Sequence, residues 1–240
     1  MLGKEYYIAG CVFTAQFPTL SAKIQQYVQK CFHMPIVRCC TPRFMLKEFE
    51  SRMPDDYRES WKALPDHAPL QAGDTVYSVC HNCLNIIEET MPGVNVKSLW
   101  ELILSDETFA FPDYNQLQVT LQDCWRSRER SSEQDAVRSL LAKMNIRYIE
   151  AKDNRQNTDF CGNSLYKPQP PRNPKLAPKH YKIGAKDKFL PHTVEEQEQI
   201  MKAYCQGYKT DTVVCYCHYC LEGVIMGGKN GKHMAELLFN

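Results

Sequence analysis

Apolar residues in this chain follow two alternating patterns, short β-branched runs and longer segments with helical spacing. In the first hundred residues, three such runs predict strands, at 6–12, 35–38 and 74–79. Apolar residues spaced by three or four predict helices after Pro18, from Cys80 to about residue 91, and from Val96 to Leu104. One face of the first helix carries Leu20, Ile24, Tyr27, Val28 and Cys31, so we interpret Cys31 as a core residue.

The same order of elements begins again in the second half. Strands are predicted at 116–122, 146–149 and 211–216, with helices at 136–144, at 193–205 and after Cys217. Thr193 and Glu196 have the spacing of a capping box for the second of these helices. The alternation predicts an α/β protein with two tandem, internally duplicated parallel-sheet halves of Rossmann-like type. We place the halves at 1–112 and 113–240.

A Pro/Lys-rich insertion at 164–192 distinguishes the second half. It holds six prolines and lacks hydrophobic periodicity, so we expect an exposed loop. Seven Lys and Arg residues lie between 167 and 188. They suggest either a docking patch for an acidic redox partner or a plain solvated loop.

Two ten-residue stretches are near copies of each other and mark the duplication. Residues 74–83 and 211–220 share Asp-Thr-Val at the front and Cys-His-x-Cys at the back. Each predicts a strand that leads into two thiols at the start of a helix, where free backbone N–H groups favour the thiolate. His81 and His218 lie inside these motifs. They could donate hydrogen bonds to cluster sulfur or ligate zinc, but we expect solvated first-turn histidines.

Composition limits the class of protein. With 43% hydrophobic residues and a formal charge of +1, the chain can form ordinary cores and has no basic excess for nucleic-acid binding. No apolar run is long enough for a signal peptide or a membrane span, so we expect a cytoplasmic protein. Twelve Cys in such a chain indicate metal or redox chemistry rather than structural disulfides.

The cysteines follow the predicted strand ends. In the first half they are Cys11, the vicinal pair Cys39 and Cys40, and Cys80 with Cys83. Carboxyl ends of parallel strands meet at one edge of a sheet, so these thiols should converge there. Thiolates suit zinc or an iron-sulfur cluster. The vicinal pair favours a cluster, because adjacent residues rarely aim both side chains at one compact ion.

This order of cysteines resembles the cysteine-rich CCG domain family, whose best-understood member is the catalytic subunit of heterodisulfide reductase. The resemblance implies that Cys11, Cys39, Cys40, Cys80 and Cys83 bind a noncubane 4Fe-4S cluster. The second motif is degenerate and keeps four thiols, Cys124, Cys161, Cys217 and Cys220. Phe160 stands at the place of the first vicinal Cys, and Thr41 stands at the place of a family glycine. The second half should therefore bind a 4Fe-4S cluster or zinc.

The sequence thus predicts an iron-sulfur oxidoreductase subunit of the heterodisulfide-reductase type, which exchanges electrons with a thiol/disulfide or another acceptor. The alternative is a metal-binding module, with zinc or iron-sulfur, that serves structure or electron relay without turnover. No nucleotide-binding glycine motif is present, so electrons should come from a separate flavin or iron-sulfur partner protein. Cys205 and Cys215 are interpreted as buried packing residues.

Overall fold

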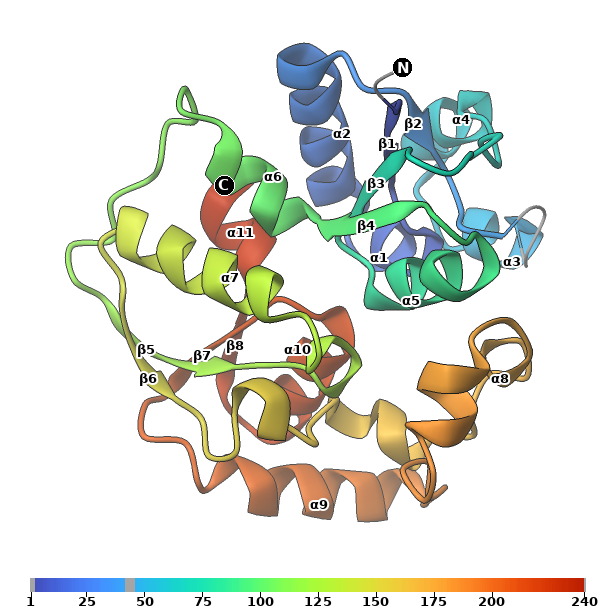
Figure 1. Cartoon of the computed structure of the whole chain (residues 1–240). Coiled ribbons are helices and arrows are strands. Elements are labelled where there is room, and N and C mark those ends of the chain that lie inside the picture. Colours follow the sequence, from blue (N-terminus) through green and yellow to red (C-terminus); the bar gives the residue numbers. More distant parts are fainter. Residues whose placement is uncertain (1–2, 42–45, 240) are drawn as a thin grey trace. The chain divides into compact units, whose positions relative to one another are not determined.

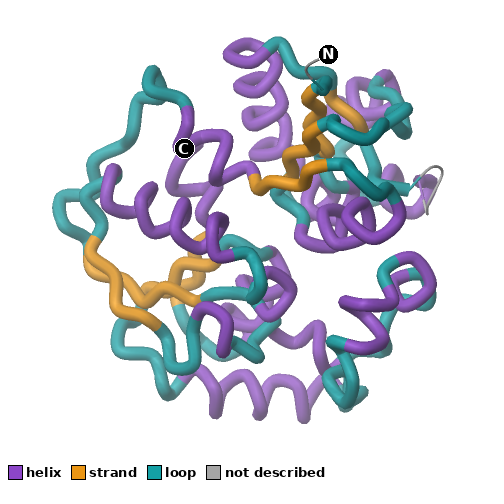
Figure 2. The backbone as a smooth tube through the Cα atoms, viewed as in Figure 1, coloured by secondary structure: helices purple, strands orange, loops and turns teal. Residues whose placement is uncertain are grey.

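The structure is a computed structural model that describes residues 3–41 and 46–239. The chain divides into two compact units, the first ending at Leu102 and the second beginning at Ile103, within one helix. Each unit is built around its own four-stranded sheet, drawn in orange in Figure 2. Among the residues described, none of the helices combines the length and apolar character that crossing a membrane requires.

The first unit is a parallel sheet in the order β2-β1-β3-β4. Its strands are β1 (Glu5–Ile8), β2 (Ile36–Val37), β3 (Thr75–Ser78) and β4 (Asn95–Ser98). Its helices are α1 (Cys11–Gln16), α2 (Pro18–Phe32), α3 (Leu46–Ser51), α4 (Asp55–Ala63), α5 (His81–Thr90) and the start of α6 (Leu99–Ser105).

The second unit repeats this topology in the order β6-β5-β7-β8, again all parallel. Its strands are β5 (Gln118–Gln122), β6 (Arg147–Glu150), β7 (Thr212–Cys215) and β8 (Asn230–His233). Its α-helices are α7 (Ser131–Lys143), α8 (Asn173–Leu176), α9 (Val194–Cys205), α10 (His218–Met226) and α11 (Met234–Phe239). Short helical turns are η1 (Trp125–Ser127), η2 (Arg155–Asn157), η3 (Gly162–Tyr166) and η4 (Lys179–Ile183).

Strand order determines which face each helix covers. The connection from β5 to β6 runs in one direction across the sheet, and those from β6 to β7 and from β7 to β8 run in the other. Because such crossovers are right-handed, α7 lies on one face and α9 and α10 lie on the opposite face, as Figure 1 shows for α7 and α9. The reversal of direction falls between β5 and β7, which is where open α/β sheets bind ligands.

The predicted α/β class and the duplicated parallel sheets are confirmed. Each sheet also has a fourth strand, β4 or β8, that the sequence pattern missed. Both are short, lie at the edge of their sheet and carry mostly polar residues, so they lack the apolar run that predicts a strand. Val96 therefore belongs to β4, and the helix that follows begins at Leu99. The first strand is shorter than predicted, since β1 ends at Ile8 and Cys11 begins a helix.

Cys31 is not a core residue. The buried positions of α2 are Ser21, Ile24 and Val28, whereas Cys31 is exposed in the last turn of the helix. Helical spacing places Cys31 near that face, but burial on α2 stops at Val28, one turn before the helix ends. The apolar stripe thus extends beyond the packed surface.

The insertion at 164–192 is not a structureless exposed loop. It contains part of η3, then α8 and η4, and it buries Asn173, Ala177, Tyr181 and Ala185. The prolines do not prevent short helices here. Pro174, for example, lies in the first turn of α8, where proline is tolerated. The capping box that follows is confirmed: Thr193 accepts a hydrogen bond from the Glu196 amide, and the Glu196 carboxylate accepts one from the Thr193 amide.

Candidate metal centre

Strand register sets two cysteines of the second unit level with each other. Gln122 of β5 pairs with Cys215 of β7, and Cys124 and Cys217 each lie two residues further along the chain. Both therefore leave the sheet at the same height on its carboxyl edge, at the point where the strand order reverses.

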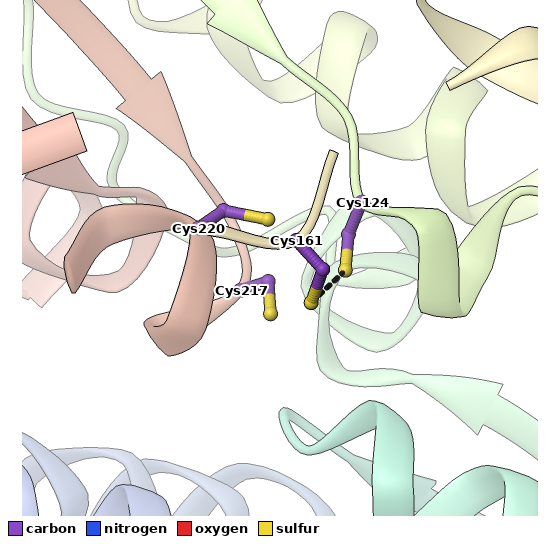
Figure 3. Close-up of side chains that lie close together, drawn as sticks. All are labelled: Cys124, Cys161, Cys217 and Cys220. Atoms are coloured by element: carbon purple, nitrogen blue, oxygen red, sulfur yellow. Dashed lines mark hydrogen bonds between the residues drawn. The ribbon is translucent and has the colours of Figure 1, made fainter. Parts of the chain in front are cut away.

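Cys161 and Cys220 complete a group of four at this edge. The four Sγ atoms all lie within 4.8 Å of one another, and all four residues are buried. The Sγ atoms of Cys124 and Cys161 are 3.5 Å apart. Figure 3 shows the four side chains pointing toward one another from three separate segments of the chain.

Each segment reaches the centre at the start of a helical turn. Cys124 precedes η1, Cys161 precedes η3, and Cys217 precedes α10, each as the N-cap residue. Cys220 lies in the first turn of α10, so Cys217 and Cys220 are three residues apart on one side of that helix. The N-terminal ends of helices carry free N–H groups, and these favour negative charge on the sulfurs.

Backbone contacts between neighbours of the cysteines hold the segments together. The Trp125 amide donates a hydrogen bond to the Phe160 carbonyl at 2.8 Å, which ties the Cys124 turn to the Cys161 turn. Gly162, with φ of +59°, packs so closely on α10 that a Cβ would lie 1.9 Å from the Tyr219 carbonyl oxygen. A glycine is therefore required directly after Cys161.

Burial and mutual contact shift the thiols in opposite directions. Burial raises the pKa of Cys124 and of Cys220, and hydrogen bonds with Cys161 and Cys217 add to the rise for both. Burial also opposes ionisation of Cys161, but hydrogen bonds from Cys124 and Cys220 and the charge of Arg126 outweigh it and lower the pKa of Cys161. Burial thus disfavours ionisation of most of the group, and a bound cation would favour the thiolate forms.

The predicted second-half residues Cys124, Cys161, Cys217 and Cys220 are therefore brought together as one buried group that can hold a metal. Four sulfurs bound tetrahedrally at 2.3 Å from a zinc ion would be about 3.8 Å apart. In this group one Sγ–Sγ distance is 3.5 Å and none exceeds 4.8 Å, so the donor set and its compactness fit a single thiophilic ion.

Arg126, for which the sequence pattern gives no signal, lies beside the same centre. Its Nη1 donates a hydrogen bond to Cys161 Sγ and another, of 3.2 Å, to Ser164 Oγ. The side chain is buried, with the residue only 5% exposed. Arg126 follows Cys124 by two residues, and this spacing has no periodic signature. Only the tertiary structure therefore reveals the contact between Arg126 and Cys161.

The five predicted first-half cysteines are also buried and lie close together. A hydrogen bond with Cys39, followed by burial, raises the pKa of Cys11. Hydrogen bonds with Cys40 and Cys80 raise the pKa of Cys83 in the same way. The thiols thus form a connected set beyond the carboxyl ends of β1, β2 and β3. That all five bind one cluster stays a prediction.

The first cysteine of the first unit lies one residue further along the chain, relative to the sheet, than the first cysteine of the second unit. Ile8 of β1 pairs with Ser78 of β3, so Gly10, rather than Cys11, lies level with Cys80. Gly10 has φ of +78°, and a Cβ there would be 3.0 Å from that of Cys80. Cys11 consequently begins α1, whereas Cys124 precedes its helical turn.

Several further residues of the motifs have structural positions. Cys215 and Cys205 are buried outside the group of four, as predicted for packing residues. The prediction of solvated histidines is wrong, because His81 and His218 are both buried in the first turns of α5 and α10. Parallel sheets bury both faces, and this includes the helix starts at their carboxyl edge.

No family model matches the chain, and no curated protein matches it. Among solved structures, the chain is similar to an aspartate racemase from Picrophilus torridus, with 13% sequence identity and a TM-score of 0.31. That similarity covers 98% of this chain and 91% of the racemase. The fold assignment rests on the sheet topology.

Proposed function

We propose that the chain is a thiolate metalloprotein of the CCG type that exchanges electrons with a thiol/disulfide or another redox partner. One observation carries the proposal: two sheets of the same strand order gather buried thiols from the segments that follow the same three strands. Thiolates kept this close repel one another unless a cation neutralises them. Two such sites in one chain indicate a metal-binding role for both units.

The first unit would bind an iron-sulfur cluster through Cys11, Cys39, Cys40, Cys80 and Cys83. The support is the number of thiols, since five exceed what one structural zinc ion takes, and their order, which resembles the CCG motif. A cluster at this position supplies one-electron chemistry. The chain's own residues bury the site, and Gly10 allows the turn before Cys11 to approach Cys80 closely.

The second unit would hold zinc through Cys124, Cys161, Cys217 and Cys220. The support is the compactness of the four sulfurs, which suits a single tetrahedral ion. On this proposal the second centre is structural, and the first centre transfers electrons. The second candidate is a protein that binds metal in both units but catalyses no reaction, and whose metals serve structure or electron relay. For the second unit, the compact site favours this non-catalytic role.

Anaerobic purification of the full chain with analysis of iron, acid-labile sulfide and zinc tests the proposal. Cys83→Ala should remove iron and sulfide while leaving zinc, and Cys220→Ala should do the reverse. Cys31→Ala, at an exposed position, and Cys205→Ala, at a buried position outside both sites, are the controls and should keep both metals. Zinc alone in both units would end the redox proposal, and a metal-free chain would end the metalloprotein proposal.

A further inference from the structure

Arg126 places a permanent positive charge inside the second unit. The guanidinium contacts Cys161 Sγ directly and Ser164 Oγ at 3.2 Å, and the residue is almost fully buried. Arginine stays protonated at any pH at which the protein folds. A buried cation is costly unless an anion faces it.

Four aromatic rings surround the same guanidinium. Its Cζ lies 4.9 Å from the Tyr219 ring centroid and between 5.5 and 5.9 Å from those of Trp125, Tyr181 and Phe189. Tyr181 and Phe189 both come from the insertion at 164–192, so the insertion completes this enclosure. The rings fix the guanidinium by cation–π contacts and shield its contact with Cys161 from water.

The charge balance of a metal-loaded site explains this arrangement. Four thiolates and one divalent ion carry a net charge of −2, and enclosing such a centre in protein is unfavourable without compensation. Arg126 supplies one positive charge at a ligand sulfur. In the first unit the corresponding positions after Cys11 hold the uncharged residues Val12 and Phe13.

We propose that Arg126 is a positioning residue that retains the metal of the second unit, by compensating the negative charge of the Cys124, Cys161, Cys217 and Cys220 centre. This inference rests on the proposed function, since it requires a metal at that centre. Arg126 would not bind the metal itself, but its contact with Cys161 also orients that ligand. Partners of this kind typically change metal affinity by about 10- to 100-fold.

The test compares Arg126→Gln and Arg126→Lys with the unaltered chain and with Arg128→Gln. Arg128 is a matched control, because it stands on the same segment and contacts the Trp125 ring, but is partly exposed and pairs with Glu129. Zinc and iron are measured after anaerobic purification, followed by the rate of their release to a chelator. Arg126→Gln should weaken retention in the second unit about 10- to 100-fold, Arg126→Lys should restore part of it, and Arg128→Gln should change nothing.

Urea unfolding of metal-loaded and metal-stripped protein separates this role from simple packing. Charge compensation predicts that Arg126→Gln destabilises the loaded protein but leaves the stripped protein as stable as the unaltered chain, or more so. Equal destabilisation with and without metal would overturn the inference in favour of packing. Unchanged metal release from Arg126→Gln overturns the inference and leaves the proposed function standing, whereas a second unit without metal in the unaltered chain overturns both.

Discussion

Tyr216 donates a hydrogen bond of 2.8 Å to the carboxylate of Asp123, and each of these residues directly precedes a cysteine of the second site. Asp123 is fully buried and also accepts hydrogen bonds from Arg138 and from the Arg155 amide. The bond between the two side chains therefore links the turn of Cys124 to the turn of Cys217. The relative position of two metal ligands depends on a contact between their neighbours.

Replacing Tyr216 by Phe should loosen this link. The change removes one of the two donors to the buried Asp123 Oδ1, which keeps only its longer hydrogen bond from Arg138. Because hydrogen bonds to charged groups are the stronger ones, we expect a loss of about 1 to 3 kcal/mol in the free energy of unfolding. Metal should also leave the second site faster. Urea unfolding and chelator release measure the two effects, with Tyr148→Phe as the control at a half-exposed position on β6. Equal metal release from both variants would show that the Asp123 bond does not position Cys217.

Gly162 is predicted to be the most sensitive glycine near the centre. In Gly162→Ala, the new methyl group would overlap the Tyr219 carbonyl and force η3 away from α10, which separates Cys161 from Cys220. Gly228→Ala is the matched control, because Gly228 also has a positive φ but has open space around its Cβ direction. The control should lose about 1 to 2 kcal/mol from backbone strain, and Gly162→Ala should lose a further 1 to 3 kcal/mol or so from overpacking. Thermal unfolding and metal content check this, and equal losses would rule out a role for the close approach.

Phe160 stands where the second half lacks its fifth thiol. Its ring stacks on that of Tyr204, with centroids 4.3 Å apart. Phe160→Cys should therefore cost about 0.5 to 1.5 kcal/mol of aromatic contact, while shifting the metal content or spectrum of the second unit toward that of the first. Phe160→Ala is the control, since it removes the ring without adding a ligand. Identical metal content in the two variants would mean that position 160 is not a ligand position.

The lysines of the insertion provide a test for an acidic redox partner. Lys175, Lys179, Lys182 and Lys186 are all exposed, so replacing the four by Gln should slow reduction by such a partner and reduce the dependence of the rate on salt. The charge-matched control replaces four exposed lysines elsewhere in the second unit, Lys143, Lys152, Lys202 and Lys209. Stopped-flow kinetics across ionic strength measure the effect. If both quadruple variants behave alike, the insertion has no docking role.

Acid should weaken the second unit through Glu150. Partial burial opposes ionisation of this side chain, but hydrogen bonds from Arg138 and Asn154 outweigh it and lower the pKa of the carboxyl group. A lowered pKa in the folded state stabilises the protein above the unfolded value of about 4.3 and loses that effect as pH falls below it. Unfolding of the unaltered chain and of Glu150→Gln should thus differ at pH 7 and converge in acid. A difference that persists below about pH 3 would exclude this linkage.

Local sequence determined much of this protein. The β-branched runs, the helix signals such as the Thr193 capping box, and the repeated Asp-Thr-Val and Cys-His-x-Cys segments were sufficient to predict two duplicated parallel sheets. They also placed the cysteines at strand ends. These features are readable because hydrogen bonding and side-chain direction repeat with the period of each element.

Tertiary structure alone decided which residues meet at the site. Two contacts join segments that lie far apart in the chain: Arg126 with Cys161, and Tyr181 with Arg126. The one-residue difference between Cys11 and Cys124 likewise depends on how neighbouring strands pair. Periodicity reports which face of an element is apolar, but not how far the neighbouring layer extends over it. That is why Cys31, on an apolar stripe, is exposed, while His81 and His218, on polar motifs, are buried.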